Sequence, residues 1–242
     1  LNLPALTGPF ILSMVAYILA GATLFFMLRP DPLQIARLLA QQEQQTQPLV
    51  SEASQQSDQT GIFVGTGVMI LTQMVMVGIM TMTPIHMMHH GHSLASVGVV
   101  IGFHVGFMYL PSLVTGMLVD KLGRNVLIVA AAVTLCAAGL LAAYAPTDSL
   151  PLLIVALALL GLGWNFGLIS GTALIVDHTN IHNRAKVQGS ADVFVAVSGA
   201  AAGLLSGLMV ASTSYAVLGI TGCVISLALL PLVASLRKRS AV

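Results

Sequence analysis

The chain has 242 residues, of which 57% are hydrophobic and 7% are charged, and its mean hydropathy is +0.94. Soluble domains carry about 25% charged residues, so this composition excludes a soluble enzyme and predicts a membrane protein. Nine Lys and Arg residues against eight Asp and Glu residues give a formal net charge of +1, which excludes a basic surface for nucleic acid.

Seven stretches of the sequence are long and apolar enough to cross a bilayer. A membrane-spanning helix needs about 20 predominantly apolar residues, because the hydrocarbon core is about 30 Å thick. The stretches are residues 4–28, 61–88, 94–119, 125–145, 150–176, 187–210 and 213–236. The sequence therefore predicts an all-α fold, a polytopic bundle of seven transmembrane helices within the bilayer.

Residues 29–60, between the first and second predicted spans, differ from the rest of the chain. They include QQEQQTQPLVSEASQQSDQT, which is rich in Gln and Ser and too polar to form a buried core. We expect a linker here, preceded by one transmembrane helix in residues 1–28. The chain begins with Leu1 and has no secretory signal, so we expect a sequence that lacks its N-terminal part.

The second predicted span ends in MTMTPIHMMHHGHS, residues 80–93, which holds four His and four Met residues. Pro84 removes a backbone hydrogen bond and is expected to kink the helix. His86 and His90 are four residues apart and share a helical face, so they are a candidate site for a soft metal ion. No Cys, Asp or Glu joins them, and an ordinary turn between two helices explains the same residues. We favour the turn, without a bound metal.

Polar residues inside predicted spans are candidates for a solute pathway, because an unpaired polar group in hydrocarbon costs several kcal/mol. Gln73 and His104 lie in the middle of the second and third spans. Trp164 and Asn165 lie together near the centre of the fifth span, as expected where an apolar solute with one or two polar groups binds. The alternative for Gln73 and His104 is a hydrogen bond to the backbone of a neighbouring helix.

Asp192 is the carboxylate that falls clearly within a predicted span. At 100° per residue it shares a helical face with Gly199 and Gly203, so it points at protein or water. Asp192 and His104 are the candidates for accepting a proton within the membrane. The alternative for Asp192 is an ion pair with Lys186 or Arg184 that anchors the end of the helix.

Small residues recur within the predicted spans. Glycines four residues apart predict close approach of neighbouring helices. They form three rows. The third span holds Gly98, Gly102 and Gly106, the fifth span holds Gly163, Gly167 and Gly171, and the sixth span holds Gly199, Gly203 and Gly207. The two cysteines, Cys136 and Cys223, each lie in an apolar run without an obvious partner, so we expect neither a disulfide nor metal ligation.

Basic residues follow the first, third, fifth and seventh predicted spans and are absent from residues 89–93, 146–149 and 211–214. The basic residues are Arg29, Arg37, Lys121, Arg124, Arg184, Lys186, Arg237, Lys238 and Arg239. Lys and Arg mark cytoplasmic loops, so every second loop is predicted to be cytoplasmic, as is a basic tail at residues 237–242.

The loop between the third and fourth spans reads GMLVDKLGRN. It resembles the Gly-x-x-x-Asp-Arg/Lys-x-Gly-Arg signature of the major facilitator superfamily. The matching positions are Gly116, Asp120, Lys121, Gly123 and Arg124. LTGPFILS, LGLGWNFGLISGTALI and NRAKVQGSADVF, in the first, fifth and sixth spans, are similar to the same family.

The resemblance implies two six-helix halves joined by a cytoplasmic loop. Residues 1–28 are then the last helix of a first half that is otherwise missing, residues 29–60 the loop between the halves, and residues 61–236 the complete second half. It also implies that Asp120 binds a neighbouring helix end and a nearby Arg, with Arg184 and the start of the sixth span as partners. A charge near a helix end is stabilising. Without the resemblance, the preferred interpretation of Asp120 and Lys121 is a solvated turn on the cytoplasmic side.

The function that the resemblance implies is secondary active transport of a small organic solute by alternating access, without a cofactor and without enzyme activity. We expect protons to drive it and export of amphipathic compounds, with uptake as the alternative. The location implied is a bacterial inner membrane, with the chain crossing it several times and the C-terminus in the cytoplasm. Two other interpretations are a seven-helix receptor or sensor and a Cu, Zn or Ni transporter that uses residues 80–93.

Overall fold

The computed structural model describes residues 8–31, 34–35, 38–39, 41–42, 59–181 and 183–239. The chain divides into two compact units, Leu1–Gln55 and Gln56–Val242. Most of the expected linker, including Arg37 and residues 43–58, lies outside the described residues, and so does the end of the expected basic tail, residues 240–242.

The first unit holds helix α1 (Gly8–Met27), which matches the first predicted span. Its apolar side chains are exposed, among them Leu12, Tyr17 and Phe26. The apolar part of α1, Ile11–Met27, is shorter than the membrane-spanning helices of the second unit. An apolar helix that buries so little of its surface is suited to a lipid environment.

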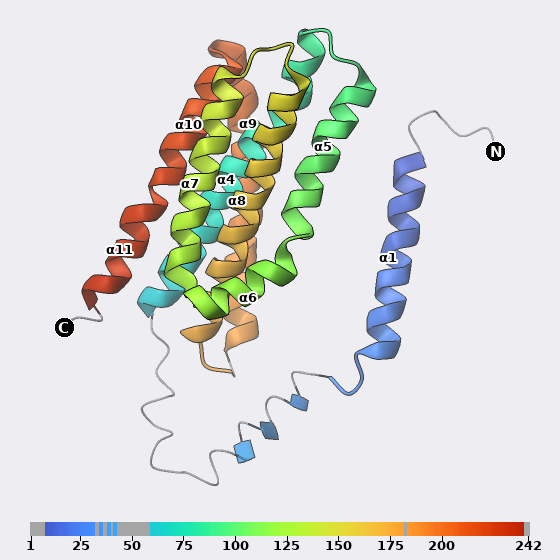
Figure 1. Cartoon of the computed structure of the whole chain (residues 1–242). Helices are drawn as coiled ribbons and strands as arrows, with labels where there is room; N and C mark the ends of the chain where they lie inside the picture. Colours follow the sequence, from blue (N-terminus) through green and yellow to red (C-terminus); the bar gives the residue numbers. More distant parts are fainter. Residues whose placement is uncertain are drawn as a thin grey trace. The chain divides into compact units, whose positions relative to one another are not determined.

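The second unit is a bundle of helices (Figure 1). They are α4 (Gln59–His89), α5 (Leu94–Tyr109), α6 (Ser112–Leu122), α7 (Arg124–Tyr144), α8 (Leu150–Asp177), α9 (Arg184–Ser212), α10 (Tyr215–Leu227) and α11 (Leu229–Arg239). Within the described residues there are five apolar stretches long enough to cross a membrane, one of them running through α10 and into α11. The bent pair α5 and α6 makes a sixth. The predicted all-α membrane bundle is confirmed.

Helix α8 lies at the centre of this bundle, where it packs against α7, α5 and α4. Of an apolar stretch of 18 residues in α8, 56% is buried inside the bundle. Of the corresponding stretch in α9, only 17% is buried. Helix α9 packs mainly on α4, and α10 packs on α7 and α4. The core between them consists of fully buried aliphatic side chains such as Ile79, Ile128, Leu135, Leu157 and Leu160.

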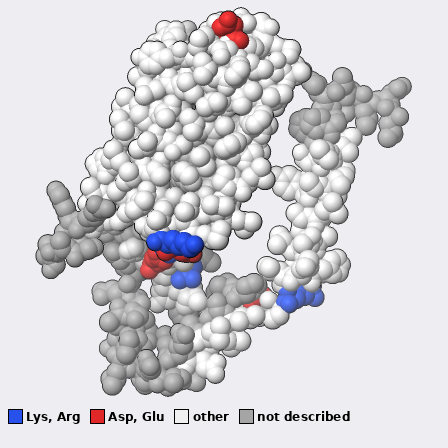
Figure 2. Space-filling model, viewed as in Figure 1, with Lys and Arg blue, Asp and Glu red and all other residues white. Residues whose placement is uncertain are grey.

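Charged side chains of the second unit gather at its two ends on the face that Figure 2 shows, and the described surface between these ends is uncharged. Helix α7, for example, exposes the apolar side chains of Val129, Val133 and Leu140. An uncharged apolar band between two polar ends is what a bilayer requires of the protein surface.

The third predicted span, residues 94–119, is broken. Helices α5 and α6 meet at an angle of 40° around Leu110 and Pro111. Pro111 has no backbone N–H to pair with the carbonyl four residues earlier, and the helix restarts with a bond from the Thr115 N–H to the Pro111 carbonyl. The prediction of one continuous helix here is therefore wrong.

Two of the three predicted glycine rows pack against neighbouring helices. A Cβ on Gly163, Gly167 or Gly171 of α8 would clash with α7 or α4, and Gly199 and Gly203 of α9 face side chains of α4. On α5, in contrast, no atom of the described residues lies within 4 Å of such a Cβ on Gly98 or Gly102. The close packing predicted from these rows is confirmed for α8 and α9, and the α5 row is open.

Helices α7 and α10 approach each other closely at Gly139 and Gly219. A Cβ on Gly139 would lie 2.5 Å from the Gly219 carbonyl oxygen and 2.9 Å from the Cys223 nitrogen. Cys136 and Cys223 face each other across this same contact and form a disulfide. The expectation that these cysteines lack a partner is wrong, because two apolar runs do not reveal which of their faces meet.

Candidate functional site

Gln73, Trp164 and Tyr109 form a polar and aromatic group on three helices of the bundle. The indole N–H of Trp164, on α8, donates to Oε1 of Gln73, on α4, at 2.7 Å. The ring of Tyr109, at the end of α5, meets the Trp164 ring edge to face, with 5.9 Å between centroids. Trp164 is buried, Gln73 is half-buried and Tyr109 is 59% exposed. Two of the predicted residues are thus brought together, and Tyr109 joins them.

Asn165, the neighbour of Trp164, is fully engaged with the α5–α6 break. Its Nδ2 donates to the Met108 carbonyl at 2.7 Å and to the Ser112 hydroxyl oxygen at 2.9 Å. Its Oδ1 accepts from the Thr115 hydroxyl at 2.6 Å. Asn165 therefore holds the end of α5 and the start of α6 against α8.

His104 is completely buried between α5 and α8. Its Nδ1 lies 2.9 Å from the Leu157 carbonyl oxygen, and since a carbonyl only accepts, Nδ1 carries the hydrogen. Nε2 has no hydrogen-bond partner within the described part of the chain. The His104 imidazole therefore has a hydrogen-bonded N–H at Nδ1 and an unpaired lone pair at Nε2, both in the interior of the bundle.

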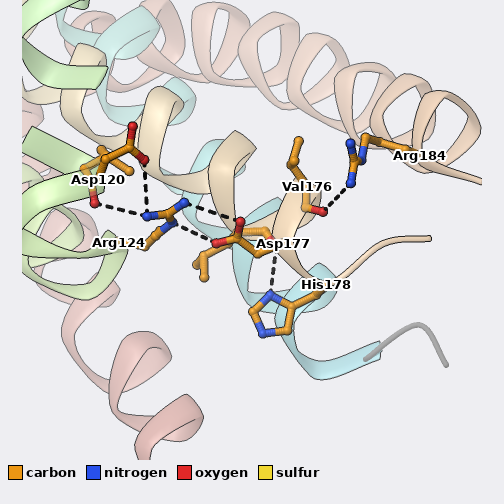
Figure 3. A network of polar contacts seen from close by, with 8 residues as sticks. Asp120, Arg124, Val176, Asp177, His178 and Arg184 are labelled. Carbon is orange, nitrogen blue, oxygen red and sulfur yellow. Dashed lines mark hydrogen bonds and ion pairs between the residues drawn. The ribbon is translucent and has the colours of Figure 1, made fainter. Parts of the chain in front are cut away.

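The loop motif builds an ion-pair network at one end of the bundle (Figure 3). Arg124, the first residue of α7, lies between Asp120 on α6 and Asp177 at the end of α8. Its Nε is 2.7 Å from Asp177, and its Nη1 is 3.4 Å from Asp120 and donates to the Val119 carbonyl at 3.2 Å. Gly123 makes the turn with φ of 89°, a backbone conformation that favours glycine.

The remaining motif residues differ in how far they join this network. Asp120 is 75% exposed and pairs with Arg124, whereas Arg184 donates to the Val176 carbonyl at 3.2 Å. Arg184 reaches the end of α8 by this bond, close to Asp177 in Figure 3. Lys121 is exposed, and within the described part of the chain no atom lies within 4 Å of the position that a Cβ would take on Gly116.

Asp177, like Tyr109, Ser112 and Thr115, was not identified from the sequence. The available signal was its position, an acidic residue at the predicted cytoplasmic end of the fifth span. Its partner Arg124 is 53 positions away, and only the packing of α7 on α8 brings the two together.

Asp192 is exposed on α9. Its carboxylate accepts from Nε2 of Gln188, one turn earlier, at 2.9 Å. Arg184, one of the two cations considered for it, donates to the Val176 carbonyl. A groove of about 420 Å³ opens beside this part of α9, lined by residues including Gln59, Thr66, Lys186, Ser190 and Phe194.

The His-rich segment forms aromatic contacts at the end of α4. The His86 ring stacks on Tyr215, the first residue of α10, with 4.2 Å between centroids, and lies 4.4 Å from the His90 ring. The Tyr215 hydroxyl is 2.8 Å from the Thr83 hydroxyl. Among the described residues, no three His, Cys, Asp or Glu side chains lie close enough to hold a metal ion.

A family profile described as Major Facilitator Superfamily matches residues 5–165 and 63–242 of the chain. The chain is 56% identical over 241 residues to the uncharacterized MFS-type transporter YdeG of Bacillus subtilis (strain 168), covering 99% of this chain and 56% of the relative. It is 54% identical over 236 residues to the uncharacterized MFS-type transporter YddS of the same organism, covering 96% and 54%.

A third relative carries a name that states its solute. The riboflavin transporter RfnT of Brucella anthropi is 32% identical over 168 residues, covering 69% of this chain and 42% of the relative. The chain spans about half the length of the curated relatives it matches.

Proposed function

This chain belongs to the major facilitator superfamily, and from that premise we propose that it forms part of a secondary active transporter for a small organic solute. The match of the family profile to almost the whole chain carries this proposal. Alternating access in such proteins places the solute near the bilayer midplane, at the border between two halves. We propose that residues 59–239 act as one half and that a second half completes the pathway.

The location and orientation follow from the same premise. The chain is a multi-pass membrane protein, and its Bacillus relatives support the inner membrane of a bacterium. The alternation of basic loops supports a cytoplasmic C-terminus. The network of Arg124 with Asp120 and Asp177 then lies at the cytoplasmic end, where it joins α6, α7 and α8.

The solute contacts are assigned to Gln73 and Trp164. Gln73 is half-buried in the middle of α4, and its amide is bonded to Trp164 on the central helix. Asn165 is assigned to the α5–α6 break because both ends of its amide are used there. The riboflavin transporter among the relatives makes riboflavin the first solute to test.

Protons are proposed as the coupling ion, with His104 as the residue that takes up the proton. Its buried Nε2 carries a lone pair without a partner within the described part of the chain, and His104 lies on the same helix as the break, about two turns before it. Asp192 is the second candidate, and its exposure and its bond to Gln188 favour a role at the helix surface. Export is proposed as the direction, with uptake as its alternative.

The family matches favour a transporter over a seven-helix receptor or sensor. They also favour an organic solute over Cu, Zn or Ni, since a relative that is 32% identical over 168 residues is named for riboflavin. The stack of His86 on Tyr215 supports a structural role for the His-rich segment, where it fastens the end of α4 to α10.

The test is a transport assay with the full-length protein in liposomes that contain a pH-sensitive dye. Riboflavin and a panel of neutral organic solutes are added under an imposed pH gradient. We expect protein-dependent solute accumulation that disappears with an uncoupler. If no solute in the panel moves, transport of this class is excluded. If accumulation survives the uncoupler, proton coupling is excluded.

A further inference from the structure

The orientation of the Gln73 amide is set by Trp164. An indole N–H can only donate, so the atom of Gln73 that it meets at 2.7 Å must be the carbonyl oxygen Oε1. The NH₂ end of the amide then points away from Trp164, and it lies 3.0 Å from the position that a Cβ would take on Gly199. It donates to no group among the described residues, and Gln73 is only half-buried. A fixed pair of N–H donors is therefore presented beside the indole.

Tyr109 supplies an open aromatic surface in contact with the same indole. Its ring contacts Trp164 edge to face, at an interplanar angle of 74°, and 59% of Tyr109 is exposed. Tyr109 follows Gly102 and Gly106 on one face of α5, and no side chain of another described helix lies within 4 Å of a Cβ built on these glycines. A planar ring can approach Tyr109 along this face, and aromatic rings attract each other in offset or edge-to-face arrangements.

The contacts that hold this group involve no ionised side chain. Gln73 bonds Trp164, Trp164 meets Tyr109, and Asn165 beside them bonds a backbone carbonyl and two hydroxyl groups. A charged solute in this place would lose its hydration without gaining a counter-charge from the described residues that form this group, which is costly in a membrane interior.

From these three observations we infer that the site takes an uncharged, planar, fused-ring aromatic solute with a hydrogen-bond acceptor at its ring edge. The ring packs on Tyr109 and the acceptor receives the N–H groups of Gln73. Trp164 acts as a positioning residue, because its N–H prevents the amide from turning its oxygen toward the solute. This inference rests on the proposed transport function, and it names the solute class of that same site.

Three two-ring probes of similar shape and different charge test the inference. They are 2-quinolone, which is neutral and has a carbonyl at its edge, the cation N-methylquinolinium and the anion quinoline-2-carboxylate. Binding to the full-length protein in lipid nanodiscs is read from quenching of tryptophan emission. Trp164 is the single tryptophan of this sequence, so its signal is the difference between the native protein and Trp164→Phe. We expect saturable quenching by 2-quinolone, at least about tenfold tighter than by either ion.

Variants separate the amide from the ring. Gln73→Glu keeps an oxygen for Trp164 but removes the N–H donors, so 2-quinolone binding should weaken about tenfold, the value of one hydrogen bond, while N-methylquinolinium binding strengthens. Tyr109→Leu should weaken 2-quinolone binding about threefold to tenfold, whereas Tyr109→Phe keeps the ring and should leave it unchanged. Elution volume and melting temperature establish that each variant is folded.

Equal binding of the three probes, or no quenching by 2-quinolone, overturns the inference. So does a folded Gln73→Glu protein that binds 2-quinolone as the native protein does. The transport assay separates this result from the proposed function. If the protein transports a solute and the Gln73→Glu and Tyr109→Leu variants transport it with the selectivity of the native protein, the proposed site is refuted. The proposed transport function then still stands. Probe binding as expected, without movement of any solute, supports the site and refutes transport.

Discussion

The guanidinium Nε of Arg124 lies 2.7 Å from the carboxylate of Asp177. This contact joins the first residue of α7 to the last residue of α8, two helices that pack along their length. Because Gly123 immediately precedes Arg124 and turns the chain, the guanidinium is delivered to the end of α8 by the backbone of the loop. The loop motif therefore stabilises this end of the bundle through a residue outside the motif.

The first prediction concerns that ion pair. Asp177→Asn should lower the free energy of unfolding by about 0.2–1 kcal/mol, because both side chains are partly exposed and water screens the pair. Asp120→Asn is the matched control and should cost less, since Asp120 is 75% exposed and lies 3.4 Å from Arg124. Thermal unfolding in detergent at low and high salt measures both changes. A larger loss for Asp120→Asn would contradict this order.

The second prediction concerns the crossing of α7 and α10. Gly139→Ala should destabilise the protein by about 1–3 kcal/mol, because the added methyl group would lie 2.5 Å from the Gly219 carbonyl oxygen. Gly102→Ala, on the open row of α5, is the control and should be neutral or slightly stabilising, since no atom of the described residues lies within 4 Å of the added methyl group. The melting temperatures of the two variants, each compared with that of the native protein, test this difference in stability. Equal melting temperatures would mean that the crossing is looser than described.

The third prediction concerns the helix break. Asn165→Asp keeps the shape of the side chain but cannot donate to the Met108 carbonyl, so it should cost about 1–3 kcal/mol of stability. Thr115→Val removes only the bond to Asn165 Oδ1 and should cost about 0.5–1.5 kcal/mol. Hydrogen exchange of the peptides around Pro111 should speed up in both variants. Unchanged exchange there would place the role of Asn165 elsewhere.

The fourth prediction concerns proton coupling. In His104→Asn the side-chain NH₂ can take the place of Nδ1 and still donate to the Leu157 carbonyl, but no titratable nitrogen remains. Solute exchange without a gradient should persist, and accumulation driven by a pH gradient should be lost. Asp192→Asn should retain both activities because Asp192 is exposed and bonded to Gln188. The reverse pattern in the liposome assay would move the coupling role to Asp192.

The sequence predicted the second unit well where hydropathy alone decides whether a segment crosses the membrane. Apolar runs of about 20 residues locate spans because hydrocarbon tolerates few charges, and α4, α7, α8 and α9 lie where they were expected. Gln73 and Trp164 were identified for the same reason, as polar groups in apolar surroundings. The hydrogen bond between Gln73 and Trp164 was not predicted, since hydropathy does not tell which faces of two helices meet.

The break at Pro111 shows the limit of counting apolar residues. Residues 94–119 are apolar enough for one span, and only the missing N–H of Pro111 reveals that the helix cannot continue unchanged. The disulfide between Cys136 and Cys223 was missed for a related reason. These cysteines are 87 positions apart, and their contact depends on the two small residues that let α7 and α10 approach.

The row of Gly98, Gly102 and Gly106 on α5 has an energetic consequence for any surface that comes to lie on it. Glycine has no rotamers, so α5 loses no side-chain entropy along this row when it is covered. A partner can also come near enough for weak Cα–H to oxygen contacts with the backbone. On the α5 side, contact along this row can therefore form and separate repeatedly without freezing and releasing side chains at each step.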